Sequence, residues 1–341
     1  MHQSEDILRI NRLLILLITL HSTISVGQDI HWSQFNDNPI YQNPAHVGHF
    51  NGDYRFIANY RDQWRSVTVP FTTLSISADS RFYKRPNIGY GILFLHDLAG
   101  DGKFRTVEFQ GNLSYLLKIS TDSIHTLRFG VNAGMNHRQL NWDALYFDNQ
   151  FNGIQFDATL PTNEVYQSDR KTNLNVGVGA IYEWNRNKHE KITAGIGFYN
   201  LNRPNQGFYG VDIQRDIRMN IFAKGIYKID IDWDLVPSMQ FSVQGKYREM
   251  LIGSSVKYTL VNKVNDYKAV YAGLWYRNRD AAYFSAGMDY NNWFVGLSYD
   301  INYSKLVPAS NLRGGFEIAA RYILNHFRPS KKIHRVCPDY I

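Results

Sequence analysis

Three histidines near the N-terminus are candidates for metal binding. His46 and His49 stand three positions apart, with His31 nearby, and such a pair could supply two zinc ligands. Zinc needs a third or fourth ligand held in place, and the neighbouring residues offer no obvious set. We therefore expect no metal site in this segment.

Other chemical motifs are weaker still. The stretch from Asp97 to Gly102 begins like a calcium loop, but it lacks oxygen ligands at the third and twelfth positions and is better interpreted as a glycine-rich hairpin tip. The chain contains no nucleophile elbow, phosphate-binding loop or dinucleotide fingerprint. We predict no catalytic residues, no cofactor and no enzyme activity; a barrel enzyme using a Ser/His pair is the lesser alternative.

Composition points to one large β domain. The 341 residues include 23 Tyr and 25 Gly, and the mean hydropathy is -0.37. Beyond the first two dozen residues no apolar run reaches the about 18 residues of a membrane helix, which excludes a helical membrane protein. The net charge of +7 favours anionic lipid headgroups or acidic partners over nucleic acid as counter-charge.

The two ends of the chain differ from the rest. Arg9 and Arg12 precede the apolar run Leu13 to Leu20 and then small residues, an order typical of a secretory signal peptide over residues 1–27. A buried N-terminal helix is the alternative. Residues 326–341 form a basic periplasmic tail, interpreted as a solvated end or as a docking arm. Its Cys337 is the single cysteine, which excludes an internal disulfide.

Between these ends, apolar and polar residues alternate with the period of two that indicates β-strands. In the first strand Tyr54, Phe56 and Tyr60 share one face, while Arg55 and Arg61 lie on the other. We count about fourteen such segments in residues 53–325: 54–64, 73–79, 88–94, 107–118, 127–136, 174–184, 192–199, 217–229, 239–247, 252–260, 269–275, 282–288, 293–301 and 316–324. An even number of this size predicts a transmembrane antiparallel up-and-down β-barrel with both termini in the periplasm.

A soluble β-sandwich also alternates, but two further observations favour the barrel. The polar face consists of Gly, Asn, Ser and Gln more than Lys and Glu, and aromatic residues gather at segment ends as in an interfacial girdle. The expected girdle residues are Trp64, Tyr182, Trp184, Tyr227, Tyr247, Tyr258, Trp275 and Trp293. Connections also alternate, with long ones such as 140–171 on the expected outer side and short ones such as 84–86 on the periplasmic side.

Polar residues expected to face the lumen are Arg55, Arg61, Glu108, Arg128, Arg138 and Lys246. They could line a channel, pair with one another, or pair with a folded N-terminal segment. Side chains alone do not fill a barrel of about fourteen strands. Residues 28–52, turned at Asn38-Pro39 and Asn43-Pro44, are our hypothesis for a plug or a periplasmic lid, with a disordered leader as the alternative.

The same segment carries a family resemblance. Its N-terminal motifs are Ser33-Gln34-Phe35, Asn38-Pro39, Asn43-Pro44-Ala45, Gly48 and Tyr60-Arg61-Asp62-Gln63-Trp64. Further motifs occur later in the chain: Trp275-Tyr276-Arg277, Ser298-Tyr299-Asp300, Gly314-Gly315-Phe316-Glu317-Ile318 and Cys337-Pro338. Together these motifs resemble the PorP/SprF family of type IX secretion system membrane proteins. Gln42 and Phe316 depart from residues common in the family, without breaking a role that can be stated.

The resemblance implies a Bacteroidetes-type cell outer-membrane barrel of the type IX secretion or gliding system. Its implied partners are secretion or gliding proteins of the periplasm and outer membrane, a secreted protein with a C-terminal sorting domain, and the lipid bilayer. The residues that carry the family signature, or that are candidates to contact a partner or the lumen, are Asn38, Pro39, Asn43, Pro44, Arg61, Gln63, Trp64, Arg277, Glu317 and Cys337. A passive outer-membrane channel for small molecules is the alternative.

Overall fold

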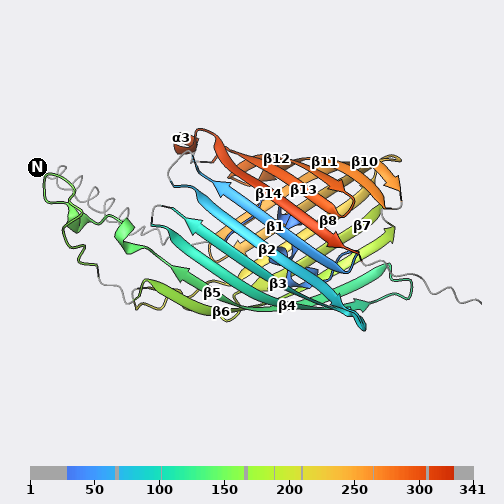
Figure 1. Ribbon diagram of the computed structural model, residues 1–341, viewed down its shortest axis with the longest axis horizontal. Helices are drawn as coiled ribbons and strands as arrows, with labels where there is room; N and C mark the ends of the chain where they lie inside the picture. The colour runs from blue at the N-terminus through green and yellow to red at the C-terminus, as the bar shows by residue number, and fades with distance from the viewer. Residues whose placement is uncertain are drawn as a thin grey trace, which may run out of the picture.

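The computed structural model describes residues 29–65, 69–100, 102–164, 168–187, 189–208, 210–263, 265–304 and 307–325. The expected signal peptide, the basic tail and Cys337 lie outside these residues. Within the described residues, fourteen strands close into an antiparallel barrel in which each strand pairs with the next and β1 pairs with β14 (Figure 1). The prediction of an up-and-down barrel of about fourteen strands is confirmed.

The strands follow the alternation in the sequence. They are β1 (Tyr54–Gln63), β2 (Phe71–Phe82), β3 (Arg85–Ala99), β4 (Phe104–Lys118), β5 (His125–Gln139), β6 (Arg170–Asn187), β7 (Glu190–Tyr199), β8 (Arg218–Lys228), β9 (Trp233–Gln244), β10 (Tyr247–Lys263), β11 (Asp266–Arg277), β12 (Ala281–Tyr290), β13 (Trp293–Asn302) and β14 (Arg313–Leu324). In β13 the burial pattern alternates without exception: Val295 and Leu297 face outward and are exposed, while Ser298 and Asp300 face inward and are buried. An apolar outer face suits contact with lipid.

Most strands are longer than the segments expected for them, such as β3 (Arg85–Ala99) against 88–94, and one expected segment spans a turn. The expected strand 239–247 crosses a turn, because β9 ends at Gln244 and β10 begins at Tyr247. Gly245 has a φ of +56°, a left-handed conformation that glycine adopts without steric cost, and with Lys246 it forms a two-residue hairpin. Lys246 is therefore exposed in this turn, and its predicted place in the lumen is wrong.

The two ends of the barrel have different connections. At one end, called the long-loop end, lie residues 140–169, 200–217 and 303–312, which include η3 (Trp142–Ala144), η4 (Asp148–Gln150) and α3 (Val307–Ser310). The long-loop end is on the left in Figure 1. The opposite, short-turn end carries tight connections such as 83–84 and 291–292, together with the start of β1 and the end of β14. In barrels of this kind the short turns face the periplasm.

Residues 29–50, called the N-terminal segment, lie inside the barrel. Asp29 forms an ion pair of 2.7 Å with Arg215 at the long-loop end, whereas His49 pairs with Glu183 of β6 nearer the short-turn end. The segment therefore runs along the lumen from the long-loop end to the start of β1. Its apolar side chains pack against the wall, where Ile40 and Val47 join Leu93 and Leu95 in a buried cluster.

The Asn-Pro pairs shape this segment. It contains η1 (Phe35–Asp37), α2 (Pro39–Gln42) and η2 (Pro44–His46), and the two prolines begin α2 and η2. Proline suits the first position of a helix because its missing N–H would have no partner there. The side chain of Asn43 caps η2 by accepting a hydrogen bond of 2.9 Å from the backbone N–H of Ala45. Across the described residues, no helix is long and apolar enough to span a membrane.

Candidate functional site in the barrel lumen

Four buried charged side chains hold the beginning of the N-terminal segment. They are Arg61 of β1, Arg277 of β11, Asp300 of β13 and Glu317 of β14, here called the charge cluster, and each is only 1% exposed. Arg61 donates to Glu317 at 2.8 Å and to Asp300 at 3.0 Å. Arg277 donates to Asp300 at 3.0 Å. Two guanidinium groups thus face two carboxylates, and such pairing is what allows charges to be buried.

Ser33 and Gln34 connect the segment to this cluster. Their backbone N–H groups each donate to the carboxylate of Glu317 at 2.9 Å. The hydroxyl of Ser33 donates to Asp300 at 2.8 Å and accepts from Arg277 at 2.6 Å. The segment is therefore bound to the charge cluster, and its removal would leave both carboxylates with the two arginines as their remaining donors.

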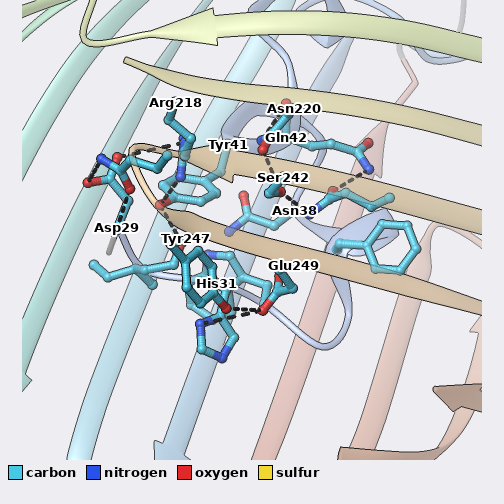
Figure 2. A pocket seen from close by; sticks show the side chains of 15 residues that line it. Asp29, His31, Asn38, Tyr41, Gln42, Arg218, Asn220, Ser242, Tyr247 and Glu249 are labelled. Carbon is cyan, nitrogen blue, oxygen red and sulfur yellow. Dashed lines mark hydrogen bonds and ion pairs between the residues drawn. The ribbon is translucent and has the colours of Figure 1, made fainter. Parts of the chain in front are cut away.

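A second group of contacts holds Asp29 and Tyr41 (Figure 2). Burial alone would raise the pKa of the Asp29 carboxyl, but the neighbouring Arg215 and Arg218 hold it well below its ordinary value. Arg218 also lies 4.4 Å from the ring centroid of Tyr41, whose hydroxyl donates to the backbone oxygen of Ile30 at 2.6 Å. Asp29 is therefore charged and paired at the long-loop end of the lumen.

Glycines of the wall make room for the segment backbone. A Cβ added at Gly130 of β5 would lie 2.5 Å from the Cα of Ala45, and one added at Gly89 of β3 would lie 2.5 Å from the carbonyl oxygen of Val47. At Gly179 of β6 a Cβ would lie 2.9 Å from the Cγ of Asn43. Real Cβ atoms do not approach so closely. The segment therefore rests on the wall at positions where the wall has no side chain.

This close packing predicts the effect of a single methyl group. The substitution Gly130→Ala should displace η2 from the wall, because overpacking of this kind costs about 1–3 kcal/mol. We expect faster chymotrypsin cleavage within the N-terminal segment, measured by mass spectrometry of the intact folded barrel. Gly111→Ala on β4 is the matched control, since its Cβ would find its nearest neighbour at 3.9 Å. Equal cleavage rates in the two variants would contradict the packing argument.

The three histidines do not come together. His46 and His49 stack with ring centroids 5.5 Å apart, whereas His31 lies 3.9 Å from Glu249 of β10. Burial, with His49 and Arg55 nearby, holds the pKa of His46 well below its ordinary value. The described residues contain no group of three or more His, Cys, Asp or Glu side chains arranged to hold a metal ion.

The predicted site residues fall into three places. Arg61, Arg277 and Glu317 meet in the charge cluster. Asn38, Pro39, Asn43 and Pro44 are buried in the N-terminal segment. Gln63 ends β1, and its amide oxygen accepts from Arg61 Nε at 3.3 Å at the edge of the charge cluster. Trp64 follows at the long-loop end, where it packs edge-on against Phe71 with centroids 4.8 Å apart. Of the other residues expected in the lumen, Arg55, Glu108, Arg128 and Arg138 do face it.

Two expected girdle residues point inward instead. Trp275 packs edge-on against Phe35 of the segment, with centroids 5.6 Å apart, and stacks on Tyr283. The hydroxyl of Tyr247 donates to Glu249 at 2.9 Å inside the lumen. The position of an aromatic residue near a strand end indicates how deep the residue lies in the membrane. It does not indicate whether the side chain points toward the lipid or toward the lumen. Trp275 shares the inward face of β11 with Arg277, which the alternation could have shown.

Sequence reasoning missed several residues that matter in the lumen. Asp300 lies on the polar face of its segment, so the alternation predicts that it points inward. The alternation does not predict its pairing with two arginines. Tyr283 donates to the backbone oxygen of Ser33 at 2.7 Å, and no pattern in the sequence marks it. A cavity of about 30 Å³ remains between the segment and β8 to β10, with Asp29, Tyr41 and Glu249 around it (Figure 2).

The chain matches a known protein family and is similar in fold to solved structures. The family model described as type IX secretion system membrane protein PorP/SprF matches residues 24–322, which include the N-terminal segment and nearly the whole barrel. No curated protein matches the chain. Among solved structures, a Pseudomonas aeruginosa FadL homologue is 13% identical, with a TM-score of 0.48 over 84% of this chain and 94% of that one. The CymD monoaromatic hydrocarbon channel is 8% identical, with a TM-score of 0.49 over 89% of this chain and 96% of that one.

Proposed function

Because the chain belongs to the PorP/SprF family of type IX secretion system membrane proteins, we propose that it is an outer-membrane barrel that docks a secreted surface protein. Its work is binding, without covalent chemistry. The observation that carries this proposal is the occupied lumen, since the N-terminal segment is tied to the wall by buried ion pairs and hydrogen bonds from end to end. Such a filled lumen suits a docking protein better than a passive channel.

The N-terminal segment acts in this proposal as a plug. Its anchors come from strands on several sides of the barrel: Glu317 of β14 binds Ser33, Gln240 of β9 accepts from Gln42 at 2.9 Å, and Asp79 of β2 accepts from Gly48 at 2.7 Å. A segment held on opposite walls cannot leave without breaking buried polar contacts on each of them. These contacts support a barrel whose lumen is closed before the partner binds.

The partner would dock at the long-loop end. The connection 140–169 extends beyond the barrel there (Figure 1) and carries large apolar side chains in the open. Ile154 is 90% exposed and Tyr146 77% exposed, and Phe151 is exposed beside them in sequence. Exposed apolar groups that gather in one place are typical of protein interaction sites. The proposed partner is a secreted protein with a C-terminal sorting domain, together with periplasmic and outer-membrane secretion components.

Co-purification from gently solubilised outer membranes tests this function. The native chain should recover a large surface-exposed protein or components of the secretion system, and the double substitution Phe151→Asp and Ile154→Asp should reduce that recovery severalfold, because charges replace the apolar contacts. Ile231→Asp is the matched control, since Ile231 is 76% exposed but lies in the 229–232 turn at the short-turn end. Recovery of neither kind of partner by the native chain would count against docking.

A further inference from the structure

A cavity of about 210 Å³ lies near the short-turn end, between the N-terminal segment and the wall. This is far more than the about 10–15 Å³ that one water molecule needs. Its lining comprises Asn36, Pro39, Gln42, His46, His49 and Phe50 of the segment, Arg55 of β1, Lys191 and Thr193 of β7, Phe222, Lys224 and Ile226 of β8, and Arg321 and Ile323 of β14. We call it the basic cavity.

The lining of the basic cavity is positively charged. It holds four basic side chains, Arg55, Lys191, Lys224 and Arg321, and no carboxylate. Three of the cations have acidic partners that stand outside the lining: Arg55 pairs with Asp79 at 2.8 Å, Lys191 with Glu183 at 2.7 Å, and Arg321 with Asp289 at 3.2 Å. The fourth cation, Lys224, makes no ion pair or hydrogen bond with the described part of the chain.

Asp37 is the carboxylate whose charge acts most on Lys224, and it does not line the basic cavity. It belongs to η1, lines a neighbouring cavity of about 100 Å³ that Lys224 also borders, and is 3.9 Å from Arg321. Burial raises the pKa of Asp37, although Arg321 and Lys224 act in the opposite direction. Lys224 thus lines the basic cavity without an ion pair or hydrogen bond to the described side chains, a costly arrangement for a buried charged group.

The rest of the lining is apolar. Phe50 of the segment, Phe222 and Ile226 of β8 and Ile323 of β14 border the same space as Lys224. A free inorganic anion would form an ion pair with Lys224, but the apolar side chains would remain in contact with water. A ligand with a carboxylate and a short apolar group would satisfy both, because burying apolar area and forming a charge-assisted hydrogen bond are each favourable.

We propose that the basic cavity binds a small amphipathic carboxylate, with its carboxylate on Lys224 and its apolar group against Phe222 and Ile323. Two sources share this chemistry: a short fatty acid and the carboxyl end of a peptide with an apolar last residue. His46 and His49 also border the cavity, so the ligand would touch the N-terminal segment as well as the wall. The site does not depend on the docking proposed above.

Binding of hexanoate to the full chain in uncharged maltoside micelles tests the proposal by isothermal titration. Hexanoate should bind, whereas hexanol, which has the same apolar chain and no charge, should bind at least about tenfold more weakly, as expected for a hydrogen bond between charged groups. Acetyl-Gly-Leu with a free carboxylate and its amide distinguish the sources. Binding of the free acid supports a peptide end, and binding of hexanoate alone supports a fatty acid.

Substitution of the lysine sharpens the test. Lys224→Met should weaken hexanoate binding at least about tenfold while leaving the thermal unfolding midpoint unchanged or higher, and Lys224→Arg should keep binding. Lys228→Met is the matched control, because Lys228 is exposed at the end of the same strand. The proposal is overturned if hexanoate does not bind the native chain, or if Lys224→Met and Lys228→Met bind it equally.

Discussion

Deletion of residues 29–50 is expected to turn a silent barrel into an open pore. A barrel of fourteen strands is too wide for its wall side chains to fill, and the segment occupies the space that they leave. Without it, the lumen would be lined by Arg61, Arg277, Asp300 and Glu317, all charged groups that attract water. Single-channel recordings in a planar bilayer should show no steady current for the full chain and stable conductance steps for the deletion variant.

The control for this deletion removes residues of the long loop instead of the lumen. Deletion within 145–164 should leave the barrel silent, since these residues project beyond its end (Figure 1). Steady conductance by the full chain would favour the passive channel over the plugged docking protein. A deletion variant that remains silent would mean that the outer connections close the barrel, and that the N-terminal segment does not control it.

The second large effect is expected from Arg61→Ala. This change leaves Asp300 with Arg277 alone and takes from Glu317 its only partner within ion-pair distance among the described side chains, and breaking a buried pair in this way costs about 3–5 kcal/mol. Because Ser33 and Gln34 bind the same carboxylates, the loss should loosen the segment. We expect a lower thermal unfolding midpoint and faster chymotrypsin cleavage within residues 29–50.

Arg65→Ala is the matched control for that substitution. Arg65 pairs with Asp62, but its side chain is 76% exposed, and exposed pairs contribute little to stability. It should leave both the unfolding midpoint and the cleavage rate unchanged. Arg61→Lys should restore stability only in part, because an ammonium cannot bind Glu317 and Asp300 with the planar geometry of a guanidinium. An Arg61→Ala variant as stable as Arg65→Ala would show that the charge cluster does not hold the segment.

The local alternation of residues determined the strands. In β1 the alternation places Tyr54, Phe56 and Tyr60 outside and Arg55 and Arg61 inside, as the structure has them, since a strand has a period of two whatever its neighbours are. The inward direction of Arg61 and Asp300 follows from that period. The alternation misled at Gly245-Lys246, where a two-residue hairpin interrupts the chain without interrupting the pattern, and Lys246 was placed in the lumen as a result.

The barrel class, the approximate strand number, the family and the inward face of most strands thus follow from residue patterns in the chain. Only the tertiary structure brought Arg61 opposite Glu317 in the register of β1 and β14, and then both to Ser33. Register and closure depend on contacts between residues 256 positions apart in the chain, which no local period encodes. The same reason hides the basic cavity, because its lining comes from the N-terminal segment, β1, β7, β8 and β14, which meet only in the closed barrel.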